Sequence, residues 1–105
     1  MGERTENVMP ADMGEVISSL AATIASRAEE LPENSYTASL LTAKPDKLLG
    51  KIVEEAAEVV MAAKDDDHDH IRYEMADLLY HLLVVAQKYG IGIDELAGEL
   101  AARMG

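Results

Sequence analysis

Apolar residues recur at intervals of three or four along most of the chain, the spacing of amphipathic helices. This spacing predicts helices over about residues 12–30, 45–64 and 69–89, and a last helix from about residue 93. Pro32 ends the first helix, and the connection after it has room for one short helical turn at Tyr36–Leu41. Because no stretch alternates convincingly with the period of a β-strand, the pattern indicates an all-α fold.

Residues typical of helix ends support these boundaries. Pro45 suits the first turn of a helix, and Asp46 lies beside the positive end of its dipole. Gly90 follows the third long helix, where helices often end in a left-handed residue. We interpret the acidic run Asp65–His70 as a solvated loop between helices, with a metal-binding segment as the alternative.

Apolar faces on three helices are candidates for the core. On the helix over 45–64 the apolar arc consists of Ile52, Val53, Ala56, Val59, Val60 and Ala63. The helix over 69–89 is apolar around most of its circumference, so we expect it to be buried. On the last helix, Leu96 and Leu100 are expected to point inward.

The helix over 45–64 has a charged face opposite its apolar arc. At about 100° per residue, Lys47, Lys51, Glu54, Glu55 and Glu58 share this face. A solvated face with salt bridges between turns is one interpretation. It is weakened by the order of the charges, because lysines that precede glutamates form the poorer pairs and place positive charge near the positive end of the dipole.

The helix over 69–89 carries a narrow polar stripe of Glu74, Asp77 and His81, within about 60° of one another. Burying an unpartnered carboxylate costs several kcal/mol, so a positive charge must face this stripe. A divalent cation shared by the acids of the two helices is the economical solution. With no cysteine in the chain, oxygen ligands favour Mg²⁺ or Mn²⁺ over zinc.

Composition excludes several other kinds of protein. The 105 residues include 20 acidic and 9 basic side chains, for a net charge of −11, which disfavours nucleic acid as a partner. The absence of cysteine excludes disulfide scaffolds and thiolate chemistry. The apolar runs are too short to span a membrane, and residues 1–12 have the wrong charge pattern for a signal peptide. We expect a soluble, cytoplasmic protein with a flexible extension at 1–12 and one domain at 13–105.

The acidic residues form a recognisable pattern. Glu54-Glu55-Ala56-Ala57-Glu58, followed after fifteen residues by Glu74-Met75-Ala76-Asp77, resembles the EExxE…ExxD motif of the MazG-like all-α nucleoside triphosphate pyrophosphohydrolases. The segments Ser35–Leu41 and Ala76–Leu83 extend the resemblance to the phosphoribosyl-ATP pyrophosphatase family. This resemblance implies a four-to-five-helix bundle that forms a homodimer or an assembly of dimers.

The resemblance also implies an activity and a metal site. The expected reaction is Mg²⁺-dependent hydrolysis of the α–β phosphoanhydride of phosphoribosyl-ATP, the second step of histidine biosynthesis, which gives phosphoribosyl-AMP and pyrophosphate. Glu55, Glu58, Glu74 and Asp77 are the implied ligands of Mg²⁺, for which Mn²⁺ could substitute. Glu54 is the candidate for orienting or deprotonating the attacking water, with metal binding as its alternative role.

Four further residues are candidates for substrate binding. Lys47 and Lys51 are placed to meet phosphate oxygens, with plain surface lysines as the alternative. Tyr36 and Thr37 are candidates for contact with substrate, with capping of the local turn as the alternative. His81 is expected to hydrogen-bond to groups that surround the metal rather than to take part in catalysis.

Other functions share parts of this pattern. One alternative is a house-cleaning pyrophosphatase that acts on modified nucleotides with the same metal site. Another is an acidic helical module without catalytic activity that binds a protein or stores cations. In a third, the acids serve only solubility.

Overall fold

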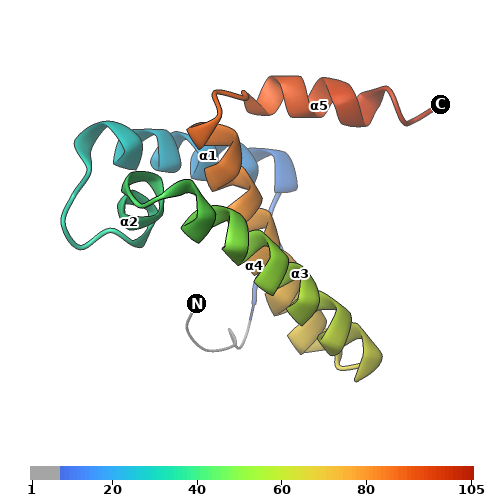
Figure 1. Cartoon of the computed structure of the whole chain (residues 1–105). Helices are drawn as coiled ribbons and strands as arrows, with labels where there is room; N and C mark the ends of the chain where they lie inside the picture. Colours follow the sequence, from blue (N-terminus) through green and yellow to red (C-terminus); the bar gives the residue numbers. More distant parts are fainter. Residues whose placement is uncertain (1–7) are drawn as a thin grey trace.

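Helices are the regular structure of residues 8–105, the part of the chain that the computed structural model describes (Figure 1). They are α1 (Met13–Glu30), α2 (Tyr36–Thr42), α3 (Pro45–Lys64), α4 (His68–Lys88) and α5 (Ile93–Ala101). The prediction of an all-α fold with four to five helices is confirmed, and the predicted boundaries differ by about one residue at most. Most of the predicted extension over residues 1–12 lies outside the described residues.

Side chains at three helix starts accept hydrogen bonds from backbone N–H groups that lack a partner within the helix. Asp12 caps α1, Ser35 caps α2 and Asp67 caps α4. The capping role considered for Tyr36 and Thr37 therefore belongs to Ser35, because the hydroxyl of Ser35 lies just before the first turn of α2. Only the first half of the acidic run Asp65–His70 is the predicted loop, because residues 65–67 connect α3 to α4 whereas residues 68–70 form the first turn of α4.

The end of α4 is fixed by a left-handed glycine, as predicted. Gly90 has φ 71°, a conformation in which a Cβ atom would be strained. The N–H of Ile91 donates to the carbonyl of Ala86 over 2.8 Å, and the N–H of Gly90 donates to that of Gln87 over 3.3 Å. This Schellman arrangement satisfies the last carbonyls of α4 and redirects the chain into α5.

The long helices α3 and α4 lie side by side and make the largest interhelical contact, while α1 and α2 cover one end of the pair (Figure 1). A cluster of buried side chains joins the four helices at this end. Its members are Ile24, Leu40, Leu48, Leu83 and Val84. The core therefore lies at one end of the α3–α4 pair, and the rest of the pair extends beyond it.

None of the six residues in the apolar arc predicted as the core face of α3 is buried, and three of them are exposed, so that prediction is wrong within the single chain. Val53 is 72% exposed, and Val60 is also exposed. The buried positions of α3 are Leu48, Glu55 and Ala62, seven residues apart. The side of α3 that faces α4 thus includes one of its glutamates.

Two other burial predictions are also wrong within the chain. On α4, Met75 is 57% exposed, and Leu79 and Leu82 are exposed as well, because α1, α2 and α3 cover only one side of this helix. On α5, Leu100 is 65% exposed and Leu96 is partly exposed. The reason is the direction of α5, which runs across the end of the bundle and away from it (Figure 1).

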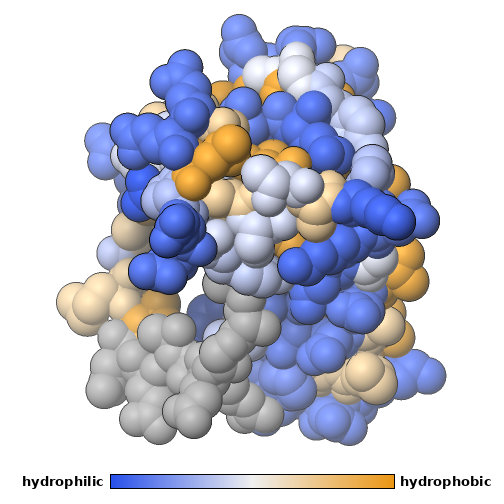
Figure 2. All heavy atoms as spheres, turned by 60° about the vertical axis from the view of Figure 1, so that its left-hand side comes forward, coloured by the Kyte–Doolittle hydropathy of each residue, from blue (hydrophilic) through white to orange (hydrophobic). Residues whose placement is uncertain are grey.

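Hydrophilic side chains cover most of the face shown in Figure 2, as expected for a chain with a net charge of −11. Between residues 8 and 105, none of the helices combines the length and the apolar character that crossing a bilayer requires.

Adjacent leucines on α3 test where the core lies. Leu48 is fully buried in the cluster, whereas its neighbour Leu49 is 40% exposed. We expect Leu48→Ala to lower the free energy of unfolding by about 2–5 kcal/mol, because it leaves a cavity. Leu49→Ala should cost less than about 1 kcal/mol. Urea unfolding followed by circular dichroism measures both, and equal losses would contradict this placement of the core.

Candidate active site

A polar cleft of about 220 Å³ opens between α3 and α4. It is lined by Lys51, Glu54, Glu55, Glu58, Tyr73, Glu74 and Asp77. All four carboxylates predicted to bind metal, together with the candidate base Glu54, therefore lie around one small volume. The two helices contribute to it because each turns an acidic stripe toward the other.

The acids differ in their exposure to solvent. Glu55, Glu74 and Asp77 are only 4%, 5% and 7% exposed. Glu54 and Glu58 are exposed. The cleft thus has a buried floor of three carboxylates and a solvated rim of two.

Glu74 has the least compensated charge of the buried acids. Its Oε1 lies 3.4 Å from His70 Nε2, but its Oε2 is buried without a hydrogen-bond partner among the described residues. Burial raises the pKa of Glu74 above its usual range, and the nearby charges of Glu58 and Glu55 raise it further. A buried acceptor without a donor is costly, so this oxygen is a natural ligand for a cation.

Glu55 and Asp77 face each other across the interface between the helices. Burial raises the pKa of Asp77, and its hydrogen bond to Glu55 raises it further. Burial alone would also raise the pKa of Glu55, but hydrogen bonds from Asp77 and Lys51 lower it below its usual range. The two carboxyl groups therefore interact directly across the interface between α3 and α4.

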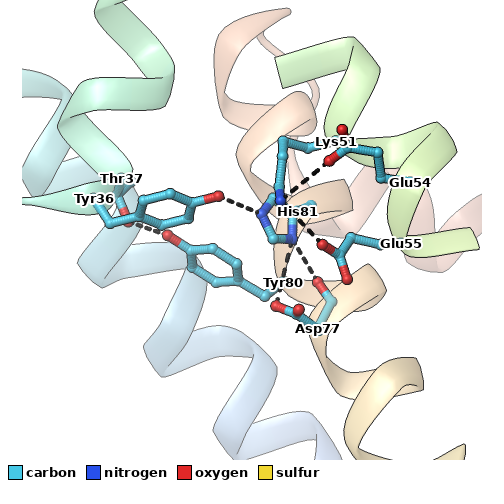
Figure 3. A network of polar contacts seen from close by, with 8 residues as sticks. All are labelled: Tyr36, Thr37, Lys51, Glu54, Glu55, Asp77, Tyr80 and His81. Carbon is cyan, nitrogen blue, oxygen red and sulfur yellow. Dashed lines mark hydrogen bonds and ion pairs between the residues drawn. The ribbon is translucent and has the colours of Figure 1, made fainter. Parts of the chain in front are cut away.

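Lys51 places its ammonium group among these acids. Its Nζ lies 3.2 Å from Glu55 Oε1 and 3.3 Å from Glu54 Oε2 (Figure 3). Partial burial lowers the pKa of Lys51, but the hydrogen bonds to Glu55 and Glu54 outweigh it and the pKa is raised, so the group stays charged. Lys47, one turn earlier, is exposed and does not line the cleft.

His81 is fully buried behind the carboxylates. Its Nδ1 lies 2.7 Å from the main-chain oxygen of Asp77, which can only accept, so Nδ1 donates. In the neutral ring Nε2 then accepts from the Tyr36 hydroxyl, 2.9 Å away (Figure 3). Both ring nitrogens therefore already have partners.

A second hydroxyl contact joins α2 to α4 beside this one. The Thr37 hydroxyl hydrogen-bonds to the Tyr80 hydroxyl, and the rings of Tyr36 and Tyr80 stack with centroids 6.3 Å apart. Thr37 is buried, whereas Tyr36 is partly exposed. These contacts hold α2 against α4 close to the cleft, and contact of either residue with substrate stays a prediction.

Two residues near the acids were not singled out by the sequence. Tyr73 lines the cleft, and His70 lies against Glu74. Each lies four residues before an acid of α4, Asp77 and Glu74 respectively. Helical spacing could therefore have pointed to them, although it does not reveal which neighbours turn toward α3.

The donors of the cleft fit a hard divalent cation. Glu55, Asp77 and His81 can each bring one ligand atom within 4.8 Å of the others. Because the ring nitrogens of His81 are occupied, carboxylate oxygens are the donors that remain, and Mg²⁺ and Mn²⁺ prefer oxygen. Glu58 and Glu74 line the same cleft but are not members of this close group.

The fold and the cleft define an all-helical protein with a carboxylate site between two of its helices. Comparison with known proteins is more specific, because the family model described as phosphoribosyl-ATP pyrophosphohydrolase matches residues 17–104. The chain belongs to this family. The family and the hydrolase class that the sequence motifs indicated are thereby confirmed.

Individual relatives agree with the family match. The phosphoribosyl-ATP pyrophosphatase of Haloarcula marismortui is 46% identical over 90% of this chain and 99% of its own length. The phosphoribosyl-ATP pyrophosphatase of Dechloromonas aromatica is 43% identical over 87% of this chain and 84% of its own length. The histidine biosynthesis bifunctional protein HisIE of Bacillus subtilis is 42% identical over 96% of this chain, which spans 48% of that longer protein.

The crowding of the acids predicts a pH dependence in metal-free protein. A carboxyl whose pKa is raised on folding binds its proton more tightly in the folded state. Glu74 therefore stabilises the fold at low pH and loses this contribution as pH rises above 4.5. We expect Glu74→Gln to gain stability relative to the wild type between pH 4.5 and 7. Urea unfolding in EDTA across this range measures the difference, and a constant difference would contradict the assigned burial of charge.

Proposed function

We propose that the chain catalyses Mg²⁺-dependent hydrolysis of the α–β phosphoanhydride of phosphoribosyl-ATP, giving phosphoribosyl-AMP and pyrophosphate. The observation that carries this proposal is the convergence of Glu55, Glu58, Glu74 and Asp77 on one cleft, in a chain of the phosphoribosyl-ATP pyrophosphohydrolase family. The relatives named phosphoribosyl-ATP pyrophosphatase support the choice of substrate.

The four carboxylates would hold the cation. When bound, Mg²⁺ neutralises phosphate oxygens and stabilises the departing pyrophosphate. The chain's contribution is to fix the ligands: Glu74 would supply a buried oxygen that has no other partner among the described residues, and Asp77 would supply a second buried carboxylate beside Glu55. His81 keeps the backbone of Asp77 in place through its Nδ1 hydrogen bond.

The rim of the cleft would act on water and on phosphate. Glu54 is exposed there, and its carboxylate can orient or deprotonate the attacking water. Lys51 lies at the same rim and can meet a phosphate oxygen with its ammonium group. Lys47, one turn further out, can contact a more distant part of a long polyanionic substrate.

An assay of pyrophosphate release tests the reaction. We expect turnover of phosphoribosyl-ATP with Mg²⁺ and none in EDTA. Glu74→Gln should lower kcat/KM by about a hundredfold or more, because it removes one charged oxygen from the cation site. The control is Glu15→Gln, the same change at an exposed position of α1.

The substrate panel should include dUTP, dCTP and damaged nucleotides. Faster turnover of these compounds than of phosphoribosyl-ATP would point to a house-cleaning pyrophosphatase. Metal binding without pyrophosphate release from any of them would point to a binding module and contradict the proposal.

We further propose that the active form is a homodimer or an assembly of dimers. An apolar groove of about 610 Å³ runs along the outer side of α4, and its lining includes Met75, Leu79 and Leu82. These apolar side chains are exposed in the middle of a long helix. Contact of so much apolar surface with water is unfavourable. A second copy would present the same apolar face and cover the groove symmetrically.

A charge placed in this groove should prevent association. We expect light scattering coupled to size exclusion to give twice the chain mass of 11.4 kDa or a multiple of it at micromolar concentration. Leu79→Arg should shift the protein toward a single chain, because a guanidinium would be buried between apolar surfaces. Ser18→Arg, at an exposed position of α1, should not. A wild type of one chain mass would refute the dimer.

A further inference from the structure

Lys51 is the cation nearest the buried floor of the cleft in the described structure. Its Nζ bridges Glu54 and Glu55, at 3.3 Å and 3.2 Å, and its side chain is only 27% exposed (Figure 3). Glu55 is one of the carboxylates that we assign to the metal. Its Oε1 already has a positive partner in the ammonium group of Lys51.

A divalent cation and this ammonium group cannot share Glu55 without repulsion. Two positive charges a few ångströms apart in a partly buried cleft oppose each other strongly. The lysine is the group that can move, because its charge sits at the end of a flexible four-carbon stem. The carboxylates cannot move as far, since Glu55, Glu74 and Asp77 are packed between α3 and α4.

We propose that Lys51 is a resident counter-ion of the cleft, which competes with the divalent cation for Glu55 and changes partner to a phosphate oxygen when the nucleotide binds. This inference rests on the proposed function, because it takes the carboxylate cation site as given. It makes the binding of metal and of phosphate cooperative: the metal displaces Lys51, and a phosphate gives the displaced ammonium a new partner. By linkage, each ligand strengthens the binding of the other.

The cooperativity has a consequence for how the site is loaded. Without nucleotide, the cleft holds its cation weakly, because Lys51 opposes it. A nucleotide that arrives with its cation supplies a new partner for Glu55 and a new partner for Lys51 at the same time. Lys51 thus favours loading of the metal–nucleotide complex over loading of the free ion.

Mn²⁺ titration by calorimetry of the full chain, without nucleotide, tests the competition. We expect Lys51→Met to bind Mn²⁺ about tenfold more tightly than the wild type, since the opposing charge is gone. Lys47→Met is the matched control: it changes the net charge equally, one turn earlier on the same helix, outside the cleft. It should stay within about twofold of the wild type.

A second titration uses inorganic pyrophosphate at fixed Mn²⁺. Here Lys51→Met should bind pyrophosphate more weakly than the wild type, because the variant has no ammonium group to contact the phosphate oxygens. Opposite changes in the two affinities are the signature of a partner exchange, whereas general damage to the cleft would weaken both. Circular dichroism and thermal unfolding verify the fold, and Lys51→Gln provides the same test if the methionine variant does not fold.

The outcomes separate this inference from the proposed function. If neither the wild type nor Lys51→Met binds Mn²⁺, the carboxylate metal site itself is refuted. If the wild type binds Mn²⁺ and Lys51→Met binds it equally or more weakly, only the competition is overturned. If Lys47→Met binds Mn²⁺ as much more tightly as Lys51→Met does, the competition is also overturned, because the effect then comes from net charge.

Discussion

Repulsion among carboxylates held between α3 and α4 is the constraint around which this molecule is organised. Three acids are buried in a contact that most helical proteins would fill with apolar side chains, and one of their oxygens has no hydrogen-bond partner within residues 8–105. The ammonium group of Lys51, which contacts Glu54 and Glu55, relieves part of this repulsion. The remaining deficit of positive charge would give the cleft an affinity for a cation, at a cost to the stability of the fold.

The rest of the fold keeps these acids in place. The apolar cluster at one end of the α3–α4 pair fixes the two helices relative to each other, and α2 is tied to α4 by two hydroxyl hydrogen bonds. One of these bonds ends on His81, whose other nitrogen holds the backbone of Asp77. A chain of contacts thus runs from α2 to a carboxylate of the cleft, and it occupies the imidazole that could otherwise have bound a softer metal.

Charge also explains how a protein with a net charge of −11 can receive a polyanion. The acids would repel a nucleotide by themselves, and the basic residues are too few to reverse the field. A cation in the cleft, with Lys51 at its rim, would convert this acidic cleft into a site for phosphate. The apolar side of α4, by contrast, carries no such chemistry and is suited to contact with another copy of the chain.

The sequence by itself determined the helices, their ends and which acids share a face of one helix, because these depend on local spacing: Gly90 ends α4, and Glu74 and Asp77 share a face at helical pitch. It did not determine which side of a helix is buried. Val53 and Val60 belong to the apolar arc of α3 but lie in solvent, while Glu55 is buried, because burial depends on which helix packs against which side. The hydrogen bonds between Tyr36 and His81 and between Thr37 and Tyr80 were likewise decided by tertiary packing, because they join α2 to α4 and no helical period relates their residues.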